Sequence, residues 1–359
     1  MLTQHIVHTS DRQELLEALA GMTADVKRLF VVHGHHSYVA CGARDVIDDL
    51  CDVNDLVLSD FNDFTEYPKK SDVDRGVEVY KQASPDLIVA IGGGSVMDMA
   101  KLIRHYSQQR LKLVAIPTTA GTGAESTQFA VCYVDGVKHS ISDEGILPDV
   151  AMLYPPFTYK NGGDLTACTG FDALAQAIES YWNIHATEVS DGYALKAIKL
   201  IYGLLPKHVL SPQERDDLML GANYAGRAIN ITRTTVPHAL SYTLTSSYGY
   251  PHGHAVALTF PFFLKYYLYG GRERYRGADY EQYMVKMNKL AALLGVDEDP
   301  FGRMRDYILS LGLGFDRQRD FDDEAVANGI NLERAGNSPM TINSDVVRAA
   351  VESIRRIQN

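Results

Sequence analysis

One aspartate and two histidines in the C-terminal half carry side chains that can bind a metal ion. Asp172 and Gln176 are four positions apart in a predicted helix, so they share one helix face. His238 opens a second predicted helix, and His252 follows a loop. Asp and His side chains that converge from separate helices are a common way to hold a divalent metal. The spacing leaves an alternative open, in which these residues only begin helices or lie in solvated loops.

A glycine triplet between a strand and a helix is the second stretch with chemical potential. Residues 87–91 form an unbroken apolar run, which is typical of a strand buried on both faces. Gly92, Gly93 and Gly94 follow, and then Ser95, which we expect to cap a helix. Without Cβ atoms, the backbone N–H groups of this turn can approach an anion. The stretch predicts a phosphate cradle for a dinucleotide, although a tight turn without a ligand would have the same pattern.

The elements that must position this turn are alternating strands and helices. We predict strands at residues 28–32, 56–58, 87–91 and 111–116, between helices at residues 11–20, 41–50 and 71–82. Strands that alternate with helices pair in parallel through right-handed crossovers. Ligands of such sheets bind beyond the carboxyl ends of the strands. The N-terminal half therefore predicts an α/β, Rossmann-like domain.

Two further polar turns follow strands at this same edge of the predicted sheet. The turn after the first strand contains Gly34, and the turn after residues 111–116 contains Thr118, Thr119 and Thr122 among glycines. Three polar, glycine-rich turns at one edge of a parallel sheet favour a nucleotide-binding cleft over a purely structural role.

The C-terminal half is predicted to be helical. Residues 129–134 and 137–142 predict a hairpin around Asp135-Gly136. From about residue 165 the apolar residues recur at helical spacing. Predicted helices cover residues 170–184, 189–205, 212–231, 238–246, 254–268, 280–293, 302–311, 323–328 and 344–357. We therefore expect a dinucleotide-binding α/β domain at residues 1–160 and an all-α domain for metal and substrate at residues 161–359.

Composition and charge exclude several classes of protein. The chain has 359 residues, 46% of them hydrophobic, and a formal net charge of −11. Without a basic stripe we expect no nucleic-acid or membrane partner, and no apolar run approaches the about 18 residues of a membrane helix. The N-terminus lacks the segments of a signal peptide. The four cysteines have no Cys-x-x-Cys spacing, so we interpret them as reduced thiols of a cytoplasmic protein.

Together these motifs resemble the iron-containing (group III) alcohol dehydrogenase superfamily, which shares a fold with glycerol dehydrogenase and dehydroquinate synthase. The matching stretches run in order along the chain: the glycine signature at residues 92–98 with Lys101, the second nucleotide loop at 117–125, and the metal region at Asp172, Glu179, His238 and 251–253. The resemblance implies a dehydroquinate synthase-like fold. It implies NADPH or NADH, a divalent metal (iron or zinc) and a small aldehyde or alcohol in a cleft between the domains, and a homo-oligomer.

The resemblance also implies a role for each of these residues. Hydride passes from nicotinamide to an aldehyde carbon, with the metal as Lewis acid. The implied metal ligands are Asp172, Gln176, His238 and His252. The implied cofactor contacts are Gly34, Gly92, Gly93, Gly94, Ser95, Asp98, Thr118, Thr119 and Thr122, with Asp98 on the nicotinamide side. The implied catalytic residues are Gln176, Tyr242 and His254, where Tyr242, a water or His254 returns the proton.

Three positions depart from the family pattern. Gln176 replaces the first of three metal-binding histidines, and an amide oxygen is a weaker, harder ligand than imidazole. Tyr242 replaces a histidine that many members use for proton relay, and a phenol with a pKa of about 10 relays poorly. Gly34 replaces an aspartate that binds the ribose 2′-hydroxyl in many NAD-preferring members. We therefore favour NADPH over NADH, unless Gly34 only shapes a turn and both cofactors bind.

Residues 166–182 and 228–242 look like the phosphonoacetaldehyde reductase branch, which makes 2-hydroxyethylphosphonate in phosphonate biosynthesis. A phosphonate needs cationic donors. Arg227 and Arg233 are the candidate substrate residues, with Lys138 and His139 as further ones, although both arginines could be ordinary salt-bridge partners.

Other functions stay open at this point. The chain could be another iron-type alcohol or glycerol dehydrogenase. A cyclising lyase like dehydroquinate synthase would need more polar groups around the metal, and the residue types at 172–174 point away from it. A third alternative is a non-catalytic nucleotide-binding protein with a degraded metal site. The replacement of a metal-binding histidine by Gln176 favours this alternative.

Overall fold

The computed structural model describes residues 4–134, 137–207 and 209–358, without the side chains of Val137 and Lys138. The predicted turn at 135–136 and the Lys138 side chain thus lie outside the described residues. The chain divides into two compact units: Met1–Asn161 with Ser211–Gly226, and Gly162–Leu210 with Arg227–Asn359. The domains at residues 1–160 and 161–359 stay predictions, and the compact units differ from them by placing Ser211–Gly226 with the first unit.

The first unit contains a six-stranded sheet in which all neighbouring strands are parallel. The order is β1-β8-β5-β4-β2-β3, with strands β1 (His5–His8), β2 (Arg28–His33), β3 (Val57–Phe61), β4 (Leu87–Gly92), β5 (Leu113–Pro117) and β8 (Val150–Leu153). This confirms the predicted fold class. The sequence predicts no strand at β1 or β8, because each has four residues and their pairing joins distant parts of the chain.

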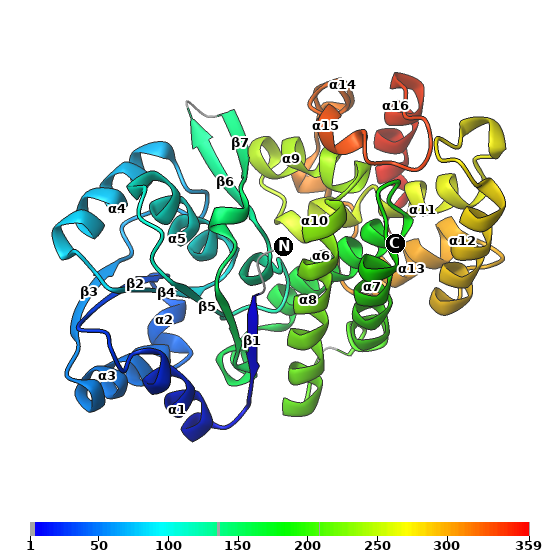
Figure 1. Cartoon of the computed structure of the whole chain (residues 1–359). Helices are drawn as coiled ribbons and strands as arrows, with labels where there is room; N and C mark the ends of the chain where they lie inside the picture. Colours follow the sequence, from blue (N-terminus) through cyan, green and yellow to red (C-terminus); the bar gives the residue numbers. More distant parts are fainter. Residues whose placement is uncertain (1–3, 135–136, 208, 359) are drawn as a thin grey trace. The chain divides into compact units, whose positions relative to one another are not determined.

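Helices cover both faces of this sheet (Figure 1). One apolar core joins α1 (Arg12–Met22), α2 (Ser37–Ala40) and α3 (Ala43–Asn54) to the sheet, and another joins α4 (Lys70–Ala83) and α5 (Gly94–Ser107). Val89 of β4 belongs to the first core and Ile88 to the second. Since successive strand residues face opposite layers, both must be apolar, which explains the unbroken run.

The strand order places the glycine turn at a topological switch point. From β2 the chain continues to β3 on one side, whereas from β4 it continues to β5 on the other. The carboxyl ends of β2 and β4 therefore flank the place where such sheets bind nucleotides. Beyond β5 lies a separate hairpin of β6 (Phe129–Val134) and β7 (Val137–Ser142), and both strands agree with the prediction.

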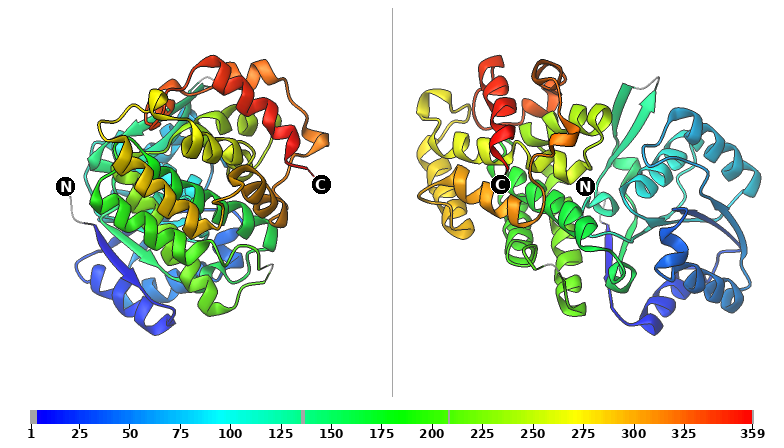
Figure 2. Two further views of the ribbon diagram at one scale, coloured as in Figure 1. Left: turned by 90° about the vertical axis from the view of Figure 1, so that its right-hand side faces the viewer. Right: turned by 180° about the vertical axis from the view of Figure 1, so that it is seen from behind.

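The second unit is built from helices (Figures 1 and 2). They are α6 (Gly163–Trp182), α7 (Glu188–Ile201), the end of α8 (Pro212–Thr232), α9 (Val236–Tyr248), α10 (His252–Ala257), α11 (Phe260–Tyr269), α12 (Tyr280–Leu294), α13 (Pro300–Ser310), α14 (Asp323–Asn328), α15 (Leu332–Ala335) and α16 (Ser344–Ser353). Most of α6 is buried, and Trp182 at its end stacks on Phe260, 5.3 Å away between ring centres. This long helix is therefore central to the packing of the unit.

Two local predictions are wrong. The helix expected at residues 254–268 is two helices, α10 and α11, because Pro261 in the first turn of α11 has no N–H to continue a helix. The first of these two helices begins at His252, directly after a loop, and not at residue 254. The N-cap of α5 is Gly93 and not Ser95, which lies inside the first turn.

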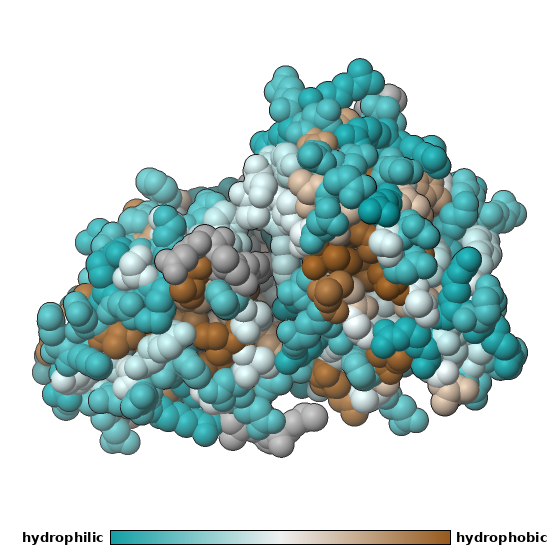
Figure 3. All heavy atoms as spheres, turned by 90° about the horizontal axis from the view of Figure 1, so that it is seen from above, coloured by the Kyte–Doolittle hydropathy of each residue, from teal (hydrophilic) through white to brown (hydrophobic). Residues whose placement is uncertain are grey.

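In the described part of the chain, each helix is too short or too polar to span a bilayer. Figure 3 shows a face on which hydrophilic residues predominate and hydrophobic residues form separate patches.

Candidate functional site

Helix α6 presents three polar side chains along one buried face. Asp172, Gln176 and Glu179 stand at positions i, i+4 and i+7, so they follow one another on that face. All three are buried. Buried carboxylates are rare unless they are paired or bind a metal. This face therefore marks a buried polar site in a helix that lies mostly inside the unit.

Helices α9 and α10 bring two histidines to Asp172. Nε2 of His238 lies 3.0 Å from Oδ1 of Asp172, and Nε2 of His252 lies 3.9 Å from the same oxygen. Asp172 and His238 are buried, whereas the His252 side chain is 34% exposed. The structure thus brings three predicted ligands together in a cluster that is open to solvent beside His252.

Gly253 explains how α10 comes close enough to α6. A Cβ at residue 253 would lie 2.0 Å from the carbonyl oxygen of Cys168 and 3.1 Å from Cβ of Asp172. A side chain cannot occupy that space, so the two helices meet backbone against backbone. This close approach places His252, the preceding residue, beside Asp172.

Glu179 holds the ring of His238. Its carboxylate accepts hydrogen bonds from Nδ1 of His238, from the Thr235 backbone N–H at 2.6 Å and from the Thr235 hydroxyl at 2.8 Å. Nε1 of Trp182 donates in turn to the Thr235 hydroxyl at 3.0 Å. With Nδ1 bound to a carboxylate, the ring presents Nε2 to Asp172, as metal-binding histidines commonly do.

Charge pairing sets the protonation of this cluster. Burial lowers the pKa of His238, but Glu179 and Asp172 more than offset this and raise it to about 9. Burial raises the pKa of Asp172, but the charge of His252 and the hydrogen bonds that Asp172 receives hold it below its ordinary value. At neutral pH the aspartate is therefore ionised and the His238 ring is protonated on both nitrogens. A metal would replace the Nε2 proton.

The three side chains fit a divalent metal. One ligand atom each from Asp172, His238 and His252 lies within 4.8 Å of the other two. A tetrahedral ion with bonds of about 2.1 Å separates its ligand atoms by about 3.4 Å, so small side-chain movements would close the site. The amide of Gln176 hydrogen-bonds to Asp172 and borders the cluster.

The two residues predicted to return a proton have different surroundings. Tyr242 lies one turn after His238 on α9, and Arg334 hydrogen-bonds to its hydroxyl. Burial raises the pKa of Tyr242, so the phenol stays protonated at neutral pH. Nε2 of His254 lies 2.7 Å from the carbonyl oxygen of Gly314. His254 is thus engaged with Gly314, whereas Tyr242 is one turn from a metal ligand.

The two arginines predicted for the substrate have partners in the second unit. Nη2 of Arg227 donates to the hydroxyl of Tyr193 at 2.6 Å, and the guanidinium lies 4.2 Å from the centre of that ring. Arg233 forms an ion pair with Glu333. Because Glu333 balances the charge of Arg233, this arginine should bind a substrate anion less strongly than its position in the sequence suggests.

In the first unit, the glycine turn enters α5 without a capping side chain or an acidic residue in the first turn. The first N–H groups of a helix need partners from outside it, and an anion can supply them. A Cβ on Gly92 would lie 2.3 Å from Val96, and one on Gly94 would lie 2.9 Å from Thr122. A side chain at residue 92 would overlap Val96, and one at residue 94 would force the Thr122 side chain to move.

The threonine loop after β5 lies against this turn. The Thr118 N–H donates to the Gly92 carbonyl at 3.0 Å. The other facing pairs are Gly93 with Thr119 and Gly94 with Thr122. The structure thus brings the two predicted nucleotide loops together within the first unit.

Ser95 and Asp98 are engaged with the protein itself. The Ser95 hydroxyl donates to the carbonyl of Glu66. The Asp98 carboxylate accepts the Val131 N–H at 3.1 Å, which ties α5 to β6. A contact of Asp98 with nicotinamide stays a prediction.

Gly34 follows β2 at the switch point. A Cβ there would lie 2.7 Å from Oγ of Ser37, so the turn is crowded as well as uncharged. The carboxylate at this end of the sheet is Asp60 of β3, whose Oδ2 lies 3.0 Å from Nε2 of His33. Sequence reasoning did not identify this pair, because it joins two strands.

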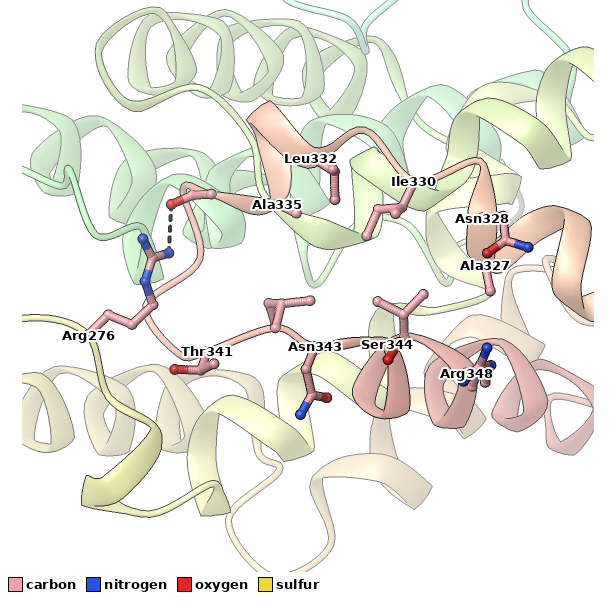
Figure 4. Close-up of a pocket in the computed structure, with 13 residues that line it drawn as sticks. Arg276, Ala327, Asn328, Ile330, Leu332, Ala335, Thr341, Asn343, Ser344 and Arg348 are labelled. Carbon is pink, nitrogen blue, oxygen red and sulfur yellow. Dashed lines mark hydrogen bonds between the residues drawn. The ribbon is translucent and has the colours of Figure 1, made fainter.

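A pocket of about 520 Å³ lies in the second unit, between α14 and α15 on one side and α16 on the other (Figure 4). Apolar side chains such as Ile330 and Leu332 line it, and Arg276 and Arg348 lie at its two ends. None of the predicted site residues lines this pocket, so it is distinct from the metal cluster.

Two family models match the chain: "Iron-containing alcohol dehydrogenase" over residues 3–155, and "Fe-containing alcohol dehydrogenase family, C-terminal" over residues 166–324. With the fold and the ligand cluster described above, the chain belongs to the iron-containing alcohol dehydrogenase family. This membership supports the predicted NADPH or NADH and divalent metal.

Similar proteins carry more specific names. The NAD-dependent methanol dehydrogenase of Bacillus methanolicus is 36% identical over 229 residues, which cover 58% of this chain and 60% of that protein. The chain spans 31% to 60% of the length of the curated relatives that it matches.

Solved structures match over nearly the whole chain. An iron-containing alcohol dehydrogenase from Thermotoga maritima has a TM-score of 0.83 and 27% identity, covering 99% of this chain and 98% of that one. A sulfoacetaldehyde reductase from Bifidobacterium kashiwanohense, in complex with NAD+, has a TM-score of 0.83 and 25% identity, with the same coverage.

Proposed function

We propose that this chain reduces a small aldehyde to a primary alcohol with NADPH or NADH. The observation that carries the proposal is the cluster of Asp172, His238 and His252, in a chain of this family. A non-catalytic nucleotide-binding protein would have no need to keep a buried carboxylate and two imidazoles within 4.8 Å of one another.

Each residue of the cluster then has a defined task. When bound, reduced nicotinamide supplies a hydride and a divalent metal draws electron density from the carbonyl oxygen. Asp172, His238 and His252 would hold the metal through a carboxylate and two imidazoles, and Glu179 fixes the His238 ring. The Tyr242 hydroxyl gives a proton to the aldehyde oxygen, which thereby becomes the hydroxyl of the alcohol. Gln176, which completes or borders the site, and His254 as an alternative proton donor stay secondary candidates.

The first unit binds the cofactor in this proposal. The N–H groups at Gly92–Ser95 hold the pyrophosphate at the uncapped end of α5. Thr118, Thr119 and Thr122 seat the cofactor from the adjoining loop.

The favoured substrate is phosphonoacetaldehyde, which would give 2-hydroxyethylphosphonate. Support comes from the resemblance of residues 166–182 and 228–242 to that branch, and from the likeness to a protein named sulfoacetaldehyde reductase. Phosphonate and sulfonate are both tetrahedral oxyanions beside an aldehyde. An uncharged alcohol or aldehyde, as in the methanol dehydrogenase likeness, is the alternative.

NADPH is the favoured cofactor, because residue 34 offers no carboxylate and Asp60 is paired with His33. A higher kcat/KM with NADH than with NADPH would reverse this preference. The homo-oligomer and the cytoplasmic location stay predictions.

The test is the loss of reduced-nicotinamide absorbance with phosphonoacetaldehyde, sulfoacetaldehyde, propanal and glycerol-derived aldehydes. We expect turnover with an anionic aldehyde at a kcat/KM above that of propanal. A preference for propanal would favour the general alcohol dehydrogenase, and silence with every aldehyde in the presence of Fe²⁺ or Zn²⁺ would contradict the proposal.

A further inference from the structure

In the second unit, three residue pairs join the segment just before α9 to α15 and to Asn337, which follows α15. Arg233 forms an ion pair with Glu333. Nη1 of Arg334, the residue after Glu333, donates to the Thr234 hydroxyl at 2.7 Å. Asn337 donates to the Thr234 carbonyl at 2.9 Å. The short segment that carries Arg334 is therefore fixed to the residues that precede the metal-binding helix α9.

The two arginines differ in charge balance. Arg233 faces the carboxylate of Glu333. Arg334 has neutral partners, the hydroxyls of Thr234 and Tyr242, and within the described residues it forms no ion pair with a carboxylate. Because the partners of this guanidinium are neutral, no carboxylate balances its charge. It also has N–H groups left to donate to an anion.

Arg334 also lies close to the proposed chemistry. It hydrogen-bonds to Tyr242, which follows the ligand His238 by one turn of α9. Tyr242 is near enough to Glu179, the partner of His238, for that carboxylate to raise its pKa. His238 and Tyr242 are four positions apart and share one face of α9. Arg334 therefore contacts the residue that stands one turn beyond a metal ligand on the same helix face.

We propose that Arg334 determines substrate specificity by binding the tetrahedral oxyanion, phosphonate or sulfonate, of an aldehyde whose carbonyl lies at the metal cluster. The inference rests on the proposed reductase function and names its substrate class. The planar fork of the guanidinium matches two oxyanion oxygens at once. The carboxylates of Asp172 and Glu179 would balance the charge of a divalent metal, so Arg334 would supply the positive charge that the oxyanion needs.

The competing role for Arg334 is structural, as a tie between α15 and α9. Arg276 offers a matched control, because it holds the same stretch by donating to the carbonyls of Gly336 at 2.7 Å and Ser338 at 3.0 Å. A loss that follows from loosening this stretch would appear in both variants and with every aldehyde.

The experiment compares wild type, Arg334→Ala, Arg334→Lys and Arg276→Ala with phosphonoacetaldehyde, sulfoacetaldehyde and propanal. Removing a charge-assisted contact lowers kcat/KM by about 10- to 100-fold. We expect that loss for Arg334→Ala with the two anionic aldehydes, chiefly through KM, and a clearly smaller loss with propanal, for which only the contact with the Tyr242 hydroxyl is removed. Arg334→Lys keeps part of the activity, and Arg276→Ala resembles wild type.

Equal losses with charged and uncharged aldehydes, or no loss with charged ones, would overturn the role of Arg334. A second measurement, binding of 2-hydroxyethylphosphonate by calorimetry, needs no turnover. Weaker binding by Arg334→Ala supports the oxyanion site even if the wild type reduces no aldehyde, in which case only the reductase proposal fails. Equal binding by both proteins contradicts the site directly.

Discussion

Nδ1 of His238 donates a hydrogen bond to the carboxylate of Glu179, so Nε2 is the ring nitrogen that faces Asp172. Glu179 and Asp172 stand seven positions apart on α6, and the imidazole bridges them. This arrangement fixes both the orientation of the ring and the nitrogen that can bind a metal. The metal cluster therefore depends on a residue that would not itself touch the metal.

The first prediction concerns Glu179→Gln. The carboxylate accepts three hydrogen bonds. A glutamine turns an N–H₂ group toward one of those donors, so the His238 ring loses its anchor. We expect metal affinity to fall by about 10- to 100-fold, measured by competition with a chelator. Glu188→Gln, at an exposed site on α7, is the control, and equal affinities in the two variants would contradict this account.

The second prediction separates cofactor binding from folding. A Cβ on Gly93 would lie 3.5 Å from Thr119, an ordinary contact, so Gly93→Ala should fold normally. The added methyl group would lie where we expect the pyrophosphate to approach the helix end. We expect an unchanged melting temperature and at least about 10-fold weaker NADPH binding, because charge-assisted contacts are lost.

Gly192→Ala is the control for this change. Gly192 lies inside α7, and a methyl group added there would have no atom within 4 Å, so alanine should raise stability by about 1 kcal/mol and leave cofactor binding unchanged. If Gly93→Ala binds NADPH as tightly as Gly192→Ala, the glycine turn is not the phosphate cradle.

The third prediction concerns Gly253→Ala. The methyl group would overlap the Cys168 carbonyl, so α10 must move away from α6. We expect a loss of about 1–3 kcal/mol in unfolding free energy from overpacking, together with weaker metal binding because His252 moves with α10. Urea unfolding and metal analysis measure the two effects, and an unchanged midpoint would show that the helices do not meet as described.

The fourth prediction is a pH dependence in the first unit. Burial lowers the pKa of Lys101 to about 8, although Asp98 and Glu125 work against it. Its side chain is fully buried, and Nζ donates to the Phe129 carbonyl at 2.8 Å. The unfolded chain has a lysine pKa of about 10.4, so between about pH 8 and pH 10 it holds the proton that the folded chain has released.

Lys101 therefore makes the protein more stable as pH rises through this range, by up to about 1.4 kcal/mol per pH unit. Lys101→Met removes this slope. The measurement is the unfolding free energy of both proteins from pH 7 to pH 10. The unfolding free energy of the wild type should rise relative to that of Lys101→Met as pH rises. If the difference between the two free energies stays constant or shrinks, the assignment is contradicted.

Strands of the sheet could be predicted where the local sequence pattern indicates them. Residues 87–91 are apolar without a break because both faces of β4 are covered, and that run is visible in the sequence. The pairing of β1 with β8 depends on contact between His5 and Val150, for which local periodicity holds no signal.

The candidate site was predictable in part for the same reason. The spacing of Asp172 and Gln176 on one helix face is local. The packing of Gly253 on Cys168 depends on tertiary structure. Arg233 looked suitable because it precedes His238 in the chain, but only the fold reveals that Glu333 balances its charge. Arg334, which is far from His238 in the chain, does not have such a partner among the described residues.

The most direct test of the central claim is a metal titration of metal-depleted protein with NADPH and phosphonoacetaldehyde, followed by the loss of NADPH absorbance. The account predicts that activity rises with added Fe²⁺ or Zn²⁺ to a plateau at one equivalent per chain, and that His238→Ala shows no such rise. Full activity before any metal is added, or the same titration curve for His238→Ala, would contradict it.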